Sequence, residues 1–248
     1  MTAFSPSATW LRRWLAPAPA RIRLVGLPHA GGGPAAFQGW RTRLPDDVDL
    51  LVAHLPGRET RLREAPPSDA GRVVRELVAA IGTGAPIVLF GHSWGAHLAF
   101  RLTRHLPDVR HLIVSGAGAP HCPRVMPPIA HLPRREFLDA LAALGGIPEP
   151  VLAHEELMDA LLPALRADFR LAEAPASEHP GAPLPCPITA LGGSRDPLTT
   201  DESLSAWSSY TASTFRRLTI AGDHFFHVTR QDEVVAHVVR VISEARPV

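Results

Sequence analysis

The 248-residue sequence contains no lysine, so all 25 of its basic residues are arginine. A nucleotide-binding P-loop ends in G-K-[ST], and the dinucleotide fingerprint is G-x-G-x-x-G. Neither pattern occurs in the sequence, which argues against both kinds of phosphate site. The formal net charge of only +1 also gives no general reason to expect a nucleic-acid or membrane partner.

Cysteine is scarce, and long apolar runs are absent. Cys122 and Cys186 each adjoin a proline, a pattern that favours neither a disulfide framework nor a C-x-x-C metal site. The thirteen histidines show no H-E-x-x-H or other zinc spacing, so no metal is expected. No run approaches the ~18 apolar residues of a membrane span, and charge interrupts residues 10–15. We therefore expect a cytoplasmic protein with reduced thiols.

The most informative stretch is a short apolar run that passes through G-x-S-x-G, residues 91–95, into a helical pattern. This arrangement is typical of a nucleophile elbow, in which a serine on a sharp turn projects above the edge of a sheet. The serine is Ser93, and the amide of Trp94 would begin the helix and face the space over the Ser93 hydroxyl. Alternatively, so short a pattern arises by chance in a glycine-rich turn.

Two later residues supply the partners that such a serine needs. Asp196 follows a predicted strand that begins near residue 187, and His224 follows one at 215–220. The order Ser93, Asp196, His224 is that of α/β-hydrolases, so we predict these three as catalytic residues. Asp223 adjoins His224, but neighbours on an extended turn usually point apart, so Asp196 is preferred as the acid.

A second oxyanion donor is expected from the loop at residues 28–33, which follows a predicted strand at 22–27. We assign this donor to the amide of Ala30, with His29 shaping the turn. The alternative for the segment is a phosphate loop, and for His29 itself a buried, backbone-bonded histidine is preferred over a proton-transfer role. His92 and His97, which flank the elbow serine, are interpreted as packing or cap residues rather than bases.

Strand-like and helical patterns alternate along the chain, which predicts a mostly parallel sheet with helices on both faces, the α/β-hydrolase fold. The predicted strands are 22–27, 48–53, a strand from 87 into the elbow, 112–115, a strand from about 187, and 215–220. The predicted helices are 36–44, 69–81, the segment after the elbow, 203–210 and 232–243. We expect one domain, residues 1–248.

Between about residues 119 and 187 this alternation stops. The stretch is rich in proline and holds two helical patterns with no strand between them. Two amphipathic helices inserted between strands suggest a lid that excludes water from the site. The alternative is that they pack as additional surface helices.

Together these features resemble the type II thioesterases that accompany modular polyketide and nonribosomal peptide synthetases. The matching stretches are 28–32 (PHAGG), 56–59 (PGRE), 91–95 (GHSWG), 137–146 (FLDALAALGG), 162–169 (LPALRADF), 192–197 (GGSRDP) and 222–226 (GDHFF). The resemblance implies hydrolysis of aberrant or stalled acyl groups from the phosphopantetheine arm of acyl or peptidyl carrier proteins. It implies no bound cofactor, and we expect a monomer.

The substrate-pocket candidates are His29, Trp94 and Phe225. Trp94 stands where this family commonly has methionine or another flexible apolar residue, so a rigid indole is expected to narrow the acyl pocket. Carrier proteins present acidic helices, so arginines are candidate contacts: Arg12, Arg13, Arg58, Arg61, Arg63, Arg134, Arg135, Arg216 and Arg217. Two other functions remain open, namely an esterase or acyltransferase on the same fold and a non-catalytic carrier-binding scaffold.

Overall fold

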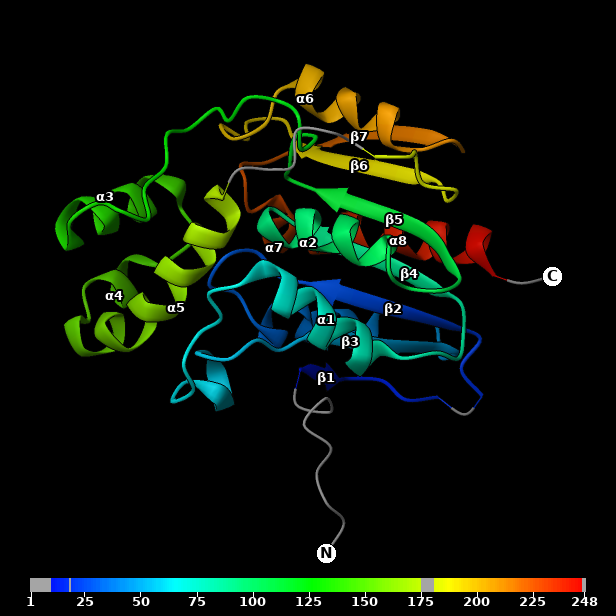
Figure 1. Ribbon diagram of the computed structural model, residues 1–248, viewed down its shortest axis with the longest axis horizontal. Helices are drawn as coiled ribbons and strands as arrows, with labels where there is room; N and C mark the ends of the chain where they lie inside the picture. The colour runs from blue at the N-terminus through cyan, green and yellow to red at the C-terminus, as the bar shows by residue number, and fades with distance from the viewer. Residues whose placement is uncertain (1–9, 18, 175–180, 247–248) are drawn as a thin grey trace, which may run out of the picture.

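The computed structural model describes residues 10–17, 19–174 and 181–246, which form a seven-stranded sheet between layers of helices (Figure 1). The strand order is β1-β3-β2-β4-β5-β6-β7, and all neighbours are parallel except β1 and β3. The strands are β1 Leu11–Arg13, β2 Ile22–Leu27, β3 Val48–Ala53, β4 Ile87–His92, β5 Val109–Ser115, β6 Ile188–Gly193 and β7 Phe215–Ile220. The predicted α/β architecture is confirmed.

Helices cover both faces of the sheet and bury a separate apolar cluster on each. α1 (Ala70–Ile81), α2 (Trp94–Thr103) and the 3-10 helix η4 (Ala206–Tyr210) contribute to one cluster. The 3-10 helix η2 (Pro34–Thr42) and α8 (Gln231–Ala245) contribute to the other. β3 and β4 are buried along their whole length and are mostly apolar, as strands covered on both faces usually are, although β3 includes Asp49 and β4 ends at His92.

Local sequence signals explain most of these elements. Asp69 caps α1 by accepting a hydrogen bond from the Gly71 amide at 2.7 Å, and the apolar residues of α1 recur at helical spacing on its buried face. The helix expected at 36–44 is instead the 3-10 helix η2. The helical stretch at 203–210 is divided into α6 (Asp201–Ser205) and η4. Short elements with weak patterns were not predicted: β1, η3 (Glu59–Arg61) and α7 (Phe226–Thr229).

A helical insertion separates β5 from β6 and lies beyond the carboxyl ends of the strands, the side to which the arrowheads of β2 and β5 point in Figure 1. It contains α3 (Arg134–Leu144), α5 (Glu155–Glu173) and a short helix, α4 (Glu149–Leu152), that was not expected. Its small apolar core, centred on Phe137 and Met158, is distinct from the two clusters of the sheet. Of the helices in the described ranges, none has both the length and the apolar character that a membrane crossing needs.

Candidate active site

Ser93 lies on the sharp turn between β4 and α2, with φ 56° and ψ −122°. A non-glycine residue at positive φ is strained, and such strain persists only where neighbouring structure enforces it. A Cβ atom on Gly91 would come within 2.1 Å of the Gly95 carbonyl oxygen, and one on Gly95 within 2.2 Å of the Leu27 carbonyl oxygen. Both positions of G-x-S-x-G therefore require glycine, because a Cβ atom at either one would collide with backbone, as the elbow prediction supposed.

His224 and Asp196 form a buried pair beside this turn. Nδ1 of His224 lies 3.0 and 3.1 Å from the two carboxylate oxygens of Asp196, and the two side chains are 4% and 0% exposed. Asp196 also accepts a hydrogen bond from the Leu198 amide at 2.9 Å, which orients the carboxylate. Asp223, the other acid considered, is exposed and accepts a hydrogen bond from the Phe225 amide. The structure thus pairs the imidazole with Asp196.

Gly116 links this pair to the serine. The Ser93 amide donates to the carbonyl of Ser115 at 2.7 Å, which holds the elbow against the residue preceding Gly116. A Cβ atom on Gly116 would lie 3.2 Å from Cε1 of His224, and Gly116 and Ser93 border the same cavity. Within the described ranges the Ser93 hydroxyl has no hydrogen bond. Such contacts are often long in ligand-free enzymes and tighten when substrate binds.

The two predicted oxyanion donors belong to segments that contact each other. Trp94 is the first residue of α2, so its amide has no acceptor within the helix. Ala30 lies in a tight turn closed by a hydrogen bond of 2.9 Å from the Gly32 amide to the His29 carbonyl. The start of α2 abuts the end of β2 and this loop, as the contacts of Gly95 with the Leu27 and Pro28 carbonyls show. The loop that carries Ala30 therefore follows directly on a segment that packs against the first turn of α2.

A buried ion pair, which the sequence analysis did not predict, fixes the loop that carries Ala30. Arg58 donates to both carboxylate oxygens of Asp168 at 2.6 and 3.0 Å, and the side chains are 3% and 0% exposed. Asp168 accepts a third bond from the Gly31 amide at 2.7 Å, and Arg58 donates to the Gly32 carbonyl at 3.1 Å. The pair joins the loop to α5 of the insertion.

The role first given to Arg58 is therefore wrong: a buried guanidinium cannot contact a carrier protein. The stretches PGRE and LPALRADF both appear among the family-like segments, which was the one available signal. Because the partners are 110 positions apart, spacing alone could not show that they meet.

Histidines cluster beside the Asp196–His224 pair. The rings of His92 and His227 stack with centroids 3.6 Å apart, and His29 lies 5.4 Å from His227 and 5.2 Å from Phe225. His92 is hydrogen-bonded to the Ser115 hydroxyl at 2.9 Å, consistent with a packing role. Nδ1 of His29 is buried with no hydrogen-bond partner in the described structure, so that nitrogen has no backbone bond.

Burial keeps these rings neutral. It is the main cause that lowers the pKa of His29 to about 4, and electrostatic interactions with His224 and Arg58 act in the same direction. Burial also holds the pKa values of His92 and His227 well below the usual range. No group of three or more His, Cys, Asp or Glu side chains in the described residues could hold a metal ion.

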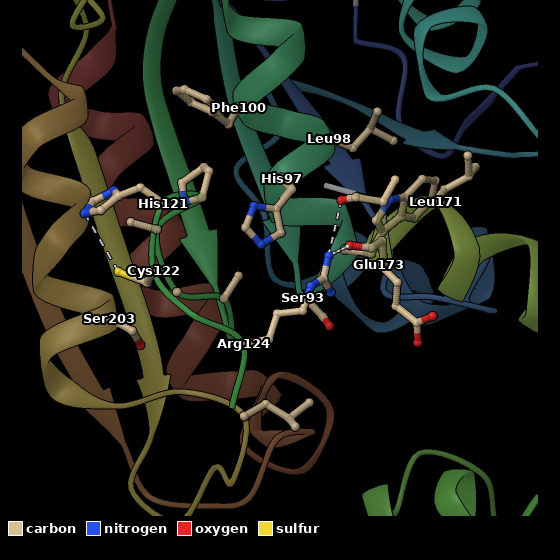
Figure 2. A pocket seen from close by; sticks show the side chains of 18 of the residues that line it. Ser93, His97, Leu98, Phe100, His121, Cys122, Arg124, Leu171, Glu173 and Ser203 are labelled. Atoms are coloured by element: carbon tan, nitrogen blue, oxygen red, sulfur yellow. Dashed lines mark hydrogen bonds between the residues drawn. The ribbon is translucent and has the colours of Figure 1, made fainter. Parts of the chain in front are cut away.

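Two cavities flank the elbow. The larger, about 750 Å³, is bordered by Ser93, Trp94 and His97 and by the loop that follows β5 (Figure 2). The smaller, about 220 Å³, is bordered by His29, Ala30 and Phe225 and by apolar residues of the insertion. The three pocket candidates therefore divide between the two cavities, with Trp94 at the larger one.

A family model described as "Thioesterase domain" matches residues 22–242. This chain belongs to the thioesterase family. The thioesterase is 36% identical over 245 residues to a protein named linear gramicidin dehydrogenase LgrE, from Brevibacillus parabrevis, covering 95% of this chain and 92% of that one. It is 36% identical over 231 residues to thioesterase PikA5 of Streptomyces venezuelae, covering 89% of this chain and 80% of the relative.

Solved structures agree with this assignment. The type II thioesterase BorB from the borrelidin biosynthetic cluster superposes on this thioesterase with a TM-score of 0.86 and 34% identity. The match covers 96% of this chain and 99% of BorB. LgrE carries a name that describes an oxidoreductase, whereas the family model, PikA5 and BorB all carry the name thioesterase. The thioesterase is therefore a hydrolase that acts on thioesters.

Proposed function

We propose that the thioesterase removes acyl groups, including aberrant or stalled intermediates, from the phosphopantetheine arm of acyl or peptidyl carrier proteins. The observation that carries the proposal is the buried Asp196–His224 pair beside the strained Ser93 turn. The names of the relatives support the biological setting, because BorB is described as a type II thioesterase of a biosynthetic cluster. Docking is transient, and the enzyme acts as a monomer.

The chemistry proceeds in two halves. Ser93 Oγ attacks the thioester carbonyl carbon while Nε2 of His224 takes the hydroxyl proton, and Asp196 stabilises the imidazolium through Nδ1. The amides of Ala30 and Trp94 donate to the oxyanion. The C–S bond then breaks, and the leaving pantetheine sulfur takes the proton from His224. Water repeats the attack on the acyl-serine ester, releasing a carboxylic acid and restoring the serine hydroxyl.

The helical insertion acts as a lid in this scheme. It lies beyond the carboxyl ends of the strands, where the site is, and Ala30 and Phe225 share the smaller cavity with its apolar residues. Closure over that cavity would exclude bulk water from the acyl-enzyme. The candidate carrier contacts that remain are exposed or partly exposed arginines. Some form surface ion pairs, as Arg134 does with Asp159 and Arg216 with Glu244. Because exposed pairs are weak, an acidic helix can displace them.

The test is hydrolysis of acyl-loaded carrier proteins by the wild-type enzyme and by Ser93→Ala. We expect turnover to fall by at least ~10³-fold, since loss of a triad member typically costs 10⁴ to 10⁶. The wild-type enzyme should also be labelled at Ser93 by a fluorophosphonate. Near wild-type hydrolysis by Ser93→Ala would refute the mechanism, and faster cleavage of free small esters than of carrier-bound thioesters would favour an esterase. A wild-type protein that binds carriers but is neither labelled nor active would be a scaffold.

A further inference from the structure

The larger cavity is lined by positive charge along α2. We propose that it selects acyl groups that carry a carboxylate remote from the thioester, and that Arg101 is the residue that binds this carboxylate. The proposal rests on the proposed function, because it names the substrate class of the same site. It concerns the side chains of this chain that border the cavity with Ser93.

Helix α2 begins directly after Ser93, so the position of a residue along the helix sets its distance from the proposed nucleophile. Ser93 caps the helix, and His97, Arg101 and Arg104 follow at four, eight and eleven positions, a spacing that places them along one face. All four border the 750 Å³ cavity. At a rise of 1.5 Å per residue, Arg101 lies about 12 Å along the axis from Ser93. Because helical side chains lean toward the N-terminus, the guanidinium of Arg101 is tilted back toward the serine.

Figure 2 shows the side chains of α2 that lie nearest to Ser93. His97 projects from α2 into the space that Ser93 and Arg124 border, and Phe100 lies further along the same helix. An acyl chain attached to Ser93 and directed into this cavity would therefore pass His97 before it reaches Arg101. The cavity is large enough to admit a medium-length chain.

The charges around the cavity favour an anion. Arg101 has no hydrogen bond or ion pair within the described residues and is only partly exposed. Arg124 donates to the backbone carbonyls of Ala172 and Ala174, contacts that leave its charge in place. Among the described lining residues the only acid is Glu173, which already accepts hydrogen bonds from the Ile129 and Ala130 amides.

The neutral state of His97 is consistent with the positive charge around the cavity. Burial is the main cause that lowers the pKa of His97 to about 4, and the charges of Arg124 and Arg101 contribute in the same direction. A carboxylate brought beside Arg101 would form charge-assisted hydrogen bonds, which are stronger than neutral ones. A protonated amine at the same place would be repelled. The cavity thus distinguishes acyl tails of matched length by their charge.

The experiment compares three pantetheine thioesters of matched length: suberoyl, octanoyl and ω-amino-octanoyl. The measured quantity is the ratio of kcat/KM for suberoyl to kcat/KM for octanoyl. In Arg101→Gln this ratio should fall 10- to 100-fold, the effect expected when a hydrogen bond to a charged group is lost. Arg101→Lys should retain part of the preference, and Arg101→Glu should shift it toward the ω-amino-octanoyl thioester. In the wild-type enzyme, preference for the diacid should rise from succinyl to suberoyl, because the shorter chain cannot span the distance to Arg101.

Arg110→Gln is the matched control, since Arg110 is exposed on β5 beside Asp108 and does not border the cavity. That variant should show the wild-type ratio. The proposal would be overturned if Arg101→Gln left the ratio of kcat/KM for suberoyl to kcat/KM for octanoyl unchanged. It would also be overturned if Arg101→Gln and Arg101→Lys each lowered kcat/KM equally for the two thioesters. Octanoyl hydrolysis that depends on Ser93 would still uphold the thioesterase function in that case. Failure to hydrolyse any carrier-bound acyl group would refute that function instead.

Discussion

Replacing Asp168 by asparagine should separate the structural and catalytic roles of the Arg58–Asp168 pair. Asparagine keeps an oxygen that can accept from the Gly31 amide but removes the charge opposite Arg58. An unpaired charge in a site that is 3% exposed destabilises the fold by about 3–5 kcal/mol. For a domain of this size 1 kcal/mol shifts Tm by about 2–4 °C, so we expect Tm to fall by roughly 6–20 °C.

The double variant Arg58→Met, Asp168→Leu carries the argument further. Replacing a buried ion pair by apolar side chains of similar volume is often neutral or stabilising, so Tm should return close to the wild-type value. The Gly31 amide, however, loses its acceptor, and the loop that carries the Ala30 amide loses its attachment to α5. Loss of one oxyanion donor typically costs 10²–10³-fold in kcat, so a displaced donor should lower kcat by up to about 100-fold with little change in KM.

Thermal melts by circular dichroism and steady-state hydrolysis of an acyl-pantetheine thioester well below the lowest Tm provide the two measurements. Asp159→Asn is the control, because it removes the acid of an exposed ion pair on the same helix and should change stability by less than about 1 kcal/mol. If the double variant regains both stability and kcat, the pair has no role in positioning the loop. If Asp168→Asn has the same Tm as the wild type, the argument from buried charge fails.

Two further predictions concern the elbow and the buried histidines. Gly95→Ala should lower the free energy of unfolding by about 1–3 kcal/mol and abolish most activity, because its Cβ atom would lie 2.2 Å from the Leu27 carbonyl oxygen. Urea melts and turnover measurements check this prediction. Wild-type values for both would contradict the elbow geometry. Burial lowers the pKa of His111 to about 4. The unfolded state therefore binds more protons, so stability is complete above about pH 6.5 and falls as pH decreases toward 4, by up to about 1.4 kcal/mol per pH unit for each such histidine. Urea melts between pH 7.5 and 4.5 should show that the free energy of unfolding changes less steeply with pH in His111→Asn than in the wild type. Equal slopes in the two proteins would refute the lowered pKa of His111.

Much of the fold could be predicted from the sequence, because its determinants are local. Strand-like patterns predicted β2, β3 and β7 with their observed bounds, and helical periodicity with an Asp69 cap identified α1. The glycines of G-x-S-x-G marked the elbow because contact with backbone excludes a Cβ atom at both positions. Ser93, Asp196 and His224 were then selected because each follows a predicted strand and their chain order is that of α/β-hydrolases.

Short elements were beyond the reach of this reasoning. β1 is three residues long and includes two arginines, so its pattern is not that of a buried strand. It forms only because β3 offers an edge, against which it pairs in antiparallel register. α4 likewise depends on contact with α5 rather than on a periodic pattern of its own.

The sequence by itself therefore determined most of the longer strands and helices and the position of the elbow serine, because both depend on interactions between residues close in the chain. Only the tertiary structure decided that Arg58 is buried against Asp168, that four histidine rings gather beside Asp196, and that His97 and Arg101 border a cavity. The physical reason is that burial and charge pairing depend on which distant segments meet, and a side chain's own sequence neighbourhood carries no record of that meeting.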